Sequence, residues 1–396
     1  SVTAGVPEIV FKLIGDPSTP VTSDFTWPPP IVTSSGHLIL PLNEGISYPI
    51  TDMSVTPLGA HLYGGHGLCM AWWGATDESS AGPAYMAIVD TPDDALVWPS
   101  KKDANKWILM PAWRGEKGLF GYDRQIRYRF FESGGHVSMA ESFREYRKSQ
   151  GLLATLKQKR NVNPNVDLLV GAVNVWASGF SPKSFTIQLQ NSGIQRILWS
   201  AGGSASDITW LNTNRSNVLS SRYDIYQDAM DPANFPNLAY IHSDWTSAGF
   251  PQDIVINSTG GWEHGWEVEG KVAGEWYACG VLCDSKALPY AINRTGTELK
   301  TKPYRGRFID TTTASSWREC YSPNHGMTRR QSKVWKMKLL DLFKKDFNLV
   351  VGSETGHEAA VPYLHFFEGM MSLGPYRVPD AGRNMYNKKF RRRKKV

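Results

Sequence analysis

Short apolar runs separated by Gly, Pro, Asp and Ser fill the first third of the chain. The runs are His37–Leu42, Gly67–Trp73, Ala84–Val89 and Ile126–Phe131. Residues 124–131 alternate polar with apolar positions, as a half-buried strand does. This pattern predicts a sandwich of antiparallel sheets. Residues 142–160, rich in Arg, Lys, Gln and Leu, predict a connecting helix.

The pattern changes at Val166. The nearly continuous apolar run Val166–Trp176 is typical of a strand buried on both faces. Further strands are expected at Arg196–Ser200, Arg222–Gln227, Arg305–Asp310 and Asn348–Ser353. Residues 328–347 predict an amphipathic helix, with apolar residues recurring every three or four positions and a capping box at Thr328 and Gln331. Strand, helix and strand form a βαβ unit, and several in a row favour a barrel or an open parallel sheet.

These patterns divide the chain into three parts. We expect a β-sandwich with its connector helix over residues 1–160, a (β/α)8-type barrel over 161–384, and a basic tail over 385–396. About five strands are visible after Val166, whereas a closed barrel requires eight. We therefore expect the barrel to be incomplete and the chain to be truncated at its C-terminus.

The net charge of +6 is concentrated in the tail, where seven basic residues lie between Lys388 and Lys395. Without them, 36 basic residues face 37 acidic ones, so no nucleic-acid partner is expected. The tail is interpreted as a solvated or artefactual end, with an arm for anionic glycans as the alternative.

The four cysteines argue against a structural metal site. Cys279 and Cys283 form a C-x3-C pair without a matching pair or a histidine at zinc-finger spacing, so free buried thiols are expected. Asp224, Asp228 and Asp231 could suggest a hard-cation site but lack the spacing of a calcium loop. No cofactor and no metal are predicted, and whether calcium binds is left open. No apolar run reaches the roughly 20 residues of a membrane span. No signal segment is visible, which leaves the compartment open, secreted and periplasmic locations included.

Two acidic residues follow buried strands in successive βα units. Asp310 ends the run Arg305–Asp310, and Glu354 follows Asn348–Ser353. In a barrel the carboxyl ends of the strands form the catalytic face, so the two carboxylates are expected to share a cleft. Glycoside hydrolysis requires such a pair. The alternative is that each acid caps a helix or pairs with an arginine.

The residues around these acids resemble glycoside hydrolase families 101 and 129, which include α-N-acetylgalactosaminidases. The resemblance rests on an acid ending one strand, on Pro-x-His-x-x-Thr-Arg from Pro323 to Arg329, and on Val-Gly-Ser-Glu ending at Glu354. It extends more weakly to residues 221–231 and to the β-rich half, which it implies is galactose-mutarotase-like. It implies that Asp310 is the nucleophile and Glu354 the acid/base.

Other polar and aromatic residues are candidates for holding a sugar. They are Asp228 and Asp224, the stacking candidates Trp176, Trp210 and Trp262, and His325, Arg329 and His357. A tryptophan is as readily part of the core, and His325 and Arg329 have helix capping as an equal role. His357 and Glu358 are expected to tune the pKa of Glu354.

The sequence therefore predicts a retaining glycoside hydrolase that cleaves a terminal α-linked sugar, galactose- or N-acetylgalactosamine-like by resemblance, through two carboxylates. Its partner is a carbohydrate, such as an oligosaccharide or glycoconjugate. The competing hypothesis is a non-catalytic carbohydrate-binding protein with a truncated barrel.

Overall fold

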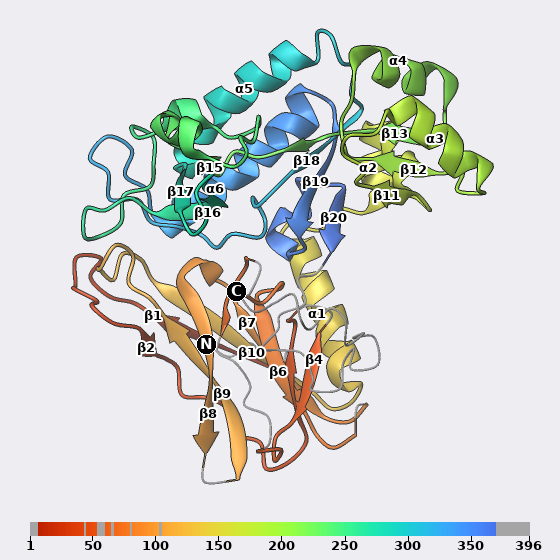
Figure 1. Ribbon diagram of the computed structural model, residues 1–396. Coiled ribbons are helices and arrows are strands. Elements are labelled where there is room, and N and C mark those ends of the chain that lie inside the picture. Colours follow the sequence, from red (N-terminus) through yellow and green to blue (C-terminus); the bar gives the residue numbers. More distant parts are fainter. Residues whose placement is uncertain are drawn as a thin grey trace.

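The computed structural model describes residues 7–42, 45–53, 60–64, 67–79, 81–102 and 105–369. The basic tail and the last part of the expected barrel lie outside these ranges. The antiparallel sheets form one half of the molecule and the α/β elements the other, with helix α1 (Gly135–Ser149) running beside the sheets toward the second half (Figure 1).

The N-terminal half is built from two antiparallel sheets. The larger sheet has the order β1 (Glu8–Leu13), β10 (Arg124–Phe131), β7 (Ala84–Val89), β6 (Trp72–Thr76), β3 (His37–Leu40) and β4 (Ile46–Pro49). The smaller has the order β2 (Phe25–Thr26), β9 (Lys106–Trp113), β8 (Ala95–Lys102) and β5 (Ala60–His61). Side chains of both sheets share one buried cluster, and α1 covers the other face of the larger sheet. Strands β6 and β7 are therefore buried on both faces.

Two expectations for this half need correction. The run Gly67–Trp73 is a strand only from Trp72, because Leu68 instead forms an isolated bridge with Leu62. The connector is not one helix over 142–160. It consists of α1 and α2 (Leu156–Val162), separated by a turn at Gly151, whose φ of +71° suits glycine.

The α/β half contains three further sheets. One is parallel, with the order β11 (Val173–Val175), β12 (Ile197–Trp199) and β13 (Val218–Ser220). The second is parallel, with the order β14 (Tyr223–Asp224), β18 (Gly306–Ile309), β19 (Val350–Thr355) and β20 (Phe366–Gly369). The third is antiparallel, with the order β15 (Asp228–Ala229), β17 (Trp276–Val281) and β16 (His264–Glu269). The helices are α3 (Pro182–Asn191), α4 (Ala205–Asn214), α5 (Ala287–Glu298) and α6 (Arg329–Asp341).

The run Val166–Trp176 was expected to be one strand, which is wrong. Its first part belongs to the 3-10 helix Pro164–Leu169, which Pro164 starts and the Asn163 side chain caps. Gly171, with a φ of +70°, then turns the chain into the short strand β11. An apolar run alone does not separate a buried strand from a buried turn of helix.

The predicted βαβ unit is confirmed. Strands β18 and β19 are parallel, with Ile309 opposite Ser353, and α6 connects them. The Thr328 side chain accepts from the Gln331 N–H while the Gln331 side chain accepts from the Thr328 N–H, which is the expected capping box. The helix ends in a π-helical turn, Leu342–Asp346, before β19.

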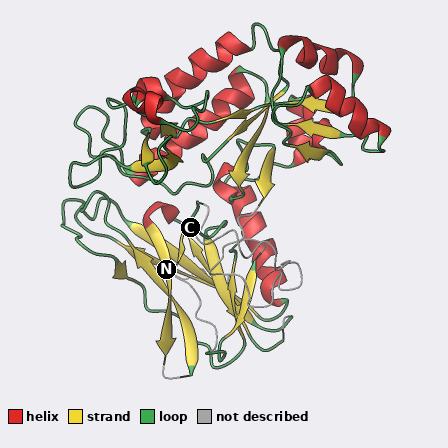
Figure 2. Ribbon diagram, in the orientation of Figure 1, coloured by secondary structure: helices red, strands yellow, loops and turns green. Residues whose placement is uncertain are grey.

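The described residues form no closed sheet. The parallel strands fall into two separate sheets, and the antiparallel sheet is inserted between β14 and β18 in the chain. The strands of the α/β half lie in separate groups, with helices beside them (Figure 2). The architecture is thus an antiparallel β-rich half followed by an open α/β half. Among the described residues, no helix is long and apolar enough to cross a membrane.

Ion pairs join the two halves at the start of α6. Arg329 pairs with Asp94 at 2.6 Å, and Arg330 with Glu116 at 2.7 Å. The buried hydrophobic cluster of the N-terminal sheets also continues into the α/β half. The orientation of α6, and of the loop that leads into it from β18, is therefore set partly by the N-terminal half.

Candidate active site

Asp310 and Glu354 lie side by side at the carboxyl end of the second parallel sheet. Because Ile309 is opposite Ser353 in the parallel register, the next residue of each strand reaches the same edge. The two carboxyl groups are close enough for Asp310 to raise the pKa of Glu354 through its charge and a hydrogen bond. The expected shared location of the two acids is therefore present in the structure.

The environment of Glu354 favours its protonated form. Burial, followed by the charge of Asp310 and the hydrogen bond with it, raises the pKa of Glu354 to about 7, with a smaller contribution from the charge of Glu368. A hydrogen bond from the Thr311 N–H acts in the opposite direction. These groups, rather than the expected His357 and Glu358, tune the pKa of Glu354. Glu368, on the four-residue strand β20, was not predicted from the sequence.

Asp310 is held in place by a tyrosine that the sequence did not reveal. The Tyr223 hydroxyl donates to Asp310 Oδ2 at 2.6 Å from the neighbouring strand β14. Thr311, directly after Asp310, has a φ of +58°, which is uncommon for a β-branched residue and typical of strained functional sites. Its hydroxyl donates to the Asp310 carbonyl at 2.7 Å, so the bend that presents the carboxylate is fixed locally.

Buried hydroxyls lock the two catalytic strands together behind the acids. Ser353 donates to the Ile309 carbonyl at 2.6 Å, and Thr313 Oγ1 lies 2.9 Å from Ser353 Oγ. The Thr355 N–H donates to Thr313 Oγ1 at 3.1 Å. These bonds fix the positions of the two carboxylates relative to each other.

Asp228 is a third carboxylate near the pair. Burial, with a smaller contribution from the charge of Asp310, raises its pKa, while a hydrogen bond from the Trp266 N–H opposes the shift. A Cβ at Gly265 would lie 2.6 Å from Asp228 Oδ1, so only glycine lets β16 approach this carboxylate so closely. The predicted sugar contact at Asp228 remains compatible with its position.

Trp176 lies next to the tyrosine that holds Asp310. Its ring is 5.0 Å from Phe308 and 6.4 Å from Tyr223, both edge-to-face, and 39% of the residue is exposed. Together with Tyr223 it borders a polar pocket of about 380 Å³. The pocket is also lined by Gly202, Gly203, Arg222, His242, Asp244 and Tyr304. Trp176 therefore offers a partly exposed ring to this pocket, and its stacking role stays a prediction.

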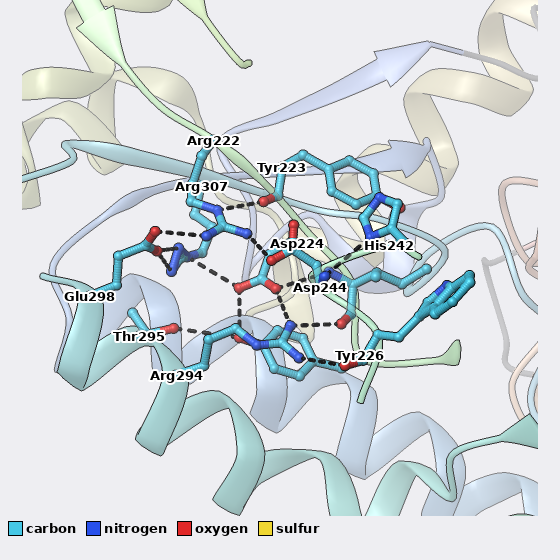
Figure 3. A network of polar contacts seen from close by, with 12 residues as sticks. Arg222, Tyr223, Asp224, Tyr226, His242, Asp244, Arg294, Thr295, Glu298 and Arg307 are labelled. Atoms are coloured by element: carbon cyan, nitrogen blue, oxygen red, sulfur yellow. Dashed lines mark hydrogen bonds and ion pairs between the residues drawn. The ribbon is translucent and has the colours of Figure 1, made fainter. Parts of the chain in front are cut away.

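A charge-balanced network adjoins this pocket, and Arg222, Asp244 and Glu298 belong to both (Figure 3). It consists of three arginines (Arg222, Arg294 and Arg307) and three acids (Asp224, Asp244 and Glu298). Buried charges are tolerated when each is paired and hydrogen-bonded. Because the network links β14, β18 and α5, it fixes the strand that carries Tyr223.

Asp224 belongs to this network rather than to a sugar-binding surface. It is fully buried, and its carboxylate pairs with Arg294 and accepts from the Tyr226 hydroxyl at 2.6 Å. The expectation that it contacts substrate hydroxyls is wrong for this conformation because both of its oxygens are used internally. Along β14, Tyr223 and Asp224 point to opposite faces of the sheet, as strand geometry requires.

Two predicted tryptophans lie away from the acids. Trp210 was expected after a strand, but it lies on α4, with Arg215 and Lys183 over its ring. Ser204 caps that helix by accepting from the Asp207 N–H, a signal that the sequence contained. Trp262 precedes β16 and stacks on His264 at 4.1 Å.

Three other predicted residues have internal partners or surroundings. Arg329 pairs with Asp94 between the two halves. His325 is buried, and its two ring nitrogens face Cys320 and the Gln252 carbonyl. His357 is buried between two aromatic rings, and burial lowers its pKa to about 3. Their expected roles in substrate binding are not supported by these positions.

The family comparison agrees with the site. Residues 205–390, a range that includes both acids, match the family described as "Glycosyl hydrolases related to GH101 family, GH129". The resemblance is confirmed. No curated protein matches the chain.

Solved structures share the fold over most of the chain. The α-N-acetylgalactosaminidase NagBb from Bifidobacterium bifidum is 19% identical in its ligand-free form, with a TM-score of 0.73 over 94% of this chain and 67% of that chain. Its GalNAc complex is 20% identical, with a TM-score of 0.73 over 94% of this chain and 66% of that chain. The cycloalternan-degrading enzyme from Trueperella pyogenes, in complex with isomaltose, is 10% identical, with a TM-score of 0.50 over 91% of this chain and 52% of that chain. The chain thus spans about two thirds of the length of NagBb and has its fold.

Proposed function

We propose that this protein is a retaining α-glycosidase that removes a terminal N-acetylgalactosamine- or galactose-like sugar. The observation that carries the proposal is the contact between Asp310 and Glu354, together with the raised pKa of Glu354. Glycoside hydrolysis uses two neighbouring carboxyl groups, one of which is protonated. The family match and the shared fold with NagBb support the same activity.

In the first step, an Asp310 oxygen attacks the anomeric carbon while Glu354 gives its proton to the leaving oxygen. The glycosidic C–O bond breaks, and a covalent glycosyl-enzyme forms. In the second step, the Glu354 carboxylate takes a proton from water as the water attacks the same carbon and releases Asp310. Two inversions leave the sugar with its original configuration.

The proximity of the two carboxyl groups favours retention over inversion. An inverting enzyme places a water between the sugar and its base, which requires the carboxyl groups to be about 6.5–9.5 Å apart. The interaction through which Asp310 raises the pKa of Glu354 needs neighbouring carboxyl groups, which supports a short separation. Retaining enzymes use a separation of about 5–5.5 Å.

Residues beside the acids supply the parts of a sugar subsite. Trp176 offers a half-exposed ring for stacking, and Asp228 a buried carboxylate for a sugar hydroxyl. Tyr223 keeps Asp310 oriented for attack. The choice of N-acetylgalactosamine or galactose follows the activity of NagBb and the family resemblance.

Hydrolysis of a panel of aryl α- and β-glycosides, followed by proton NMR of the first product, tests the proposal. We expect turnover of an α-N-acetylgalactosaminide or α-galactoside with the α-anomer released first. Asp310→Asn and Glu354→Gln should abolish or strongly reduce it, with Glu141→Gln, an exposed helix position, as the matched control. Sugar binding without turnover in the wild type would favour the competing non-catalytic carbohydrate-binding protein, and initial release of the β-anomer would contradict retention.

A further inference from the structure

Two cysteines and a histidine converge in the loop region behind the catalytic strands. Cys283 lies two residues after β17, while Cys320 and His325 lie in the segment that leads from β18 to α6. All three are buried, and their potential ligand atoms lie within 4.8 Å of one another. The sequence predicted isolated buried thiols because these residues are far apart in the chain.

The histidine presents a free lone pair to this cluster. Nε2 of His325 lies 3.0 Å from the Gln252 carbonyl, and because a carbonyl only accepts, Nε2 has to carry the proton. Nδ1 is then unprotonated in the neutral ring and faces Cys320 Sγ at 3.4 Å. A ring nitrogen fixed by a backbone carbonyl, with the other nitrogen facing sulfur, is the usual outer-shell arrangement of a metal-binding histidine.

The sulfurs are also held in place by the backbone. The Ile256 N–H points to Cys320 Sγ at 3.4 Å, and the Cys283 N–H donates to the Asp253 carbonyl at 2.8 Å. Cys320 and Met327 form an antiparallel bridge with hydrogen bonds of 2.8 and 3.0 Å, which returns the chain so that His325 faces Cys320. Three separate segments are thus arranged around one point before any ion binds.

We propose that Cys283, Cys320 and His325 form a binding site for a borderline-soft divalent cation of the Zn²⁺ class. Thiolate sulfur and imidazole nitrogen are the ligands such ions prefer, and three protein ligands leave one tetrahedral position for a small ligand. Binding releases the two thiol protons to solvent as two metal–sulfur bonds form. A hard cation such as Ca²⁺ is disfavoured because it takes six to eight oxygens.

The site joins the loop that follows Asp310 to the end of β17. A bound ion would therefore clamp that loop to the antiparallel sheet and stabilise the folded chain. This role is independent of the proposed glycosidase activity, so metal binding is measured without substrate.

Titration of the full chain with Co²⁺, after complete thiol reduction, tests the proposal directly. We expect one equivalent to bind with a thiolate-to-metal charge-transfer band and the ligand-field bands of a tetrahedral site. Binding of Co²⁺ to the metal-free protein should release about two protons per ion, and Zn²⁺ should then displace Co²⁺ without further proton release. Added Zn²⁺ should raise the midpoint of thermal unfolding, and a chelator should reverse the rise.

Variants identify the ligands. Cys320→Ser and His325→Asn should each weaken binding about 100-fold or more, because even the loss of an outer-shell partner costs roughly 10–100-fold. Cys279→Ser is the matched control, since Cys279 is an equally buried cysteine outside the cluster. Absence of the thiolate band in reduced wild-type protein would overturn the proposal, as would a Cys283–Cys320 disulfide that persists under native reducing conditions. Equal loss of binding in the control variant would also overturn it.

Discussion

Replacing Glu354 with glutamine tests most directly whether Glu354 is the proton donor of the site. Burial and the nearby charge of Asp310 move its pKa from 4.5 to about 7. At pH 7 about half of the molecules then carry the proton, compared with about 0.3% at the ordinary value, a gain of about 150-fold in the proton donor. Glutamine keeps the shape of the side chain but has no proton to give.

The expected kinetic result depends on the leaving group. For a glycoside with a poor leaving group, Glu354→Gln should lower kcat/KM about 10²- to 10⁴-fold, the usual contribution of general acid catalysis. For an activated aryl glycoside the first step needs little acid assistance. The wild-type profile of kcat/KM should fall above about pH 7 as Glu354 loses its proton. In the variant this basic limb should be absent with the activated substrate.

The same substitution should lower activity but raise the stability of the folded chain at high pH. Because the folded state raises the pKa of Glu354, it binds the proton more tightly than the unfolded state between pH 4.5 and about 7. Stability is therefore lost as the pH rises through this window. Glutamine avoids the cost of the buried charge, so the variant should be about 1–2 kcal/mol more stable at pH 8 after allowance for solvent screening. Below pH 4.5 the difference should vanish.

Two outcomes would refute this reasoning. A basic limb near pH 7 that persists in Glu354→Gln would assign the proton to another group, and Glu368, whose pKa is also raised by burial, is the next candidate. A stability difference that is the same at pH 4 and pH 8 would show that the glutamine acts through packing. Thermal unfolding at the two pH values, with Glu141→Gln as an exposed control, separates these cases.

Two further substitutions test the partners of Asp310 and of Glu358. Tyr223→Phe should lower kcat/KM about 10- to 100-fold with the fold intact by circular dichroism, because a hydrogen bond to the charged Asp310 is worth about 1.5–3 kcal/mol. Arg147→Met should destabilise the chain by about 3–5 kcal/mol in urea unfolding, because it leaves buried Glu358 without its ion-pair partner. Arg144→Met, in an exposed pair on the same helix, should change stability by less than about 1 kcal/mol, and an equal effect of both variants would contradict the second prediction.

The catalytic strands were predictable because their signals are local. Apolar residues precede Asp310 and Glu354, and a capped amphipathic helix with its own periodicity lies between the two strands. A parallel βαβ unit then places both strand ends at one edge. The residues that tune the acids were not predictable in this way. Tyr223 lies on a two-residue strand whose partner is distant in sequence, and neither strand encodes the pairing.

Partners that are distant in sequence also explain why some predicted sugar contacts instead bind other residues of the chain. Asp224 and His325 are polar residues near strand ends or loops, which is also the description of a sugar contact. Their actual partners, Arg294 and Cys320, come from other segments and are brought close only by the fold. A sequence read in isolation shows the polar group but not the group that satisfies it.

The segments that follow the two acids both reach the N-terminal half. After Glu354 the chain turns so that Glu358 accepts from Tyr63 and pairs with Arg147 at the end of α1. After Asp310 the loop leads to Arg329, whose pair with Asp94 is largely buried. A loop that supports a catalytic carboxylate has to be rigid if the carboxylate is to stay oriented. The β-rich half therefore supports the edge that carries both acids, since the α/β half alone would leave Glu358 without Tyr63 and Arg147, and Arg329 without Asp94.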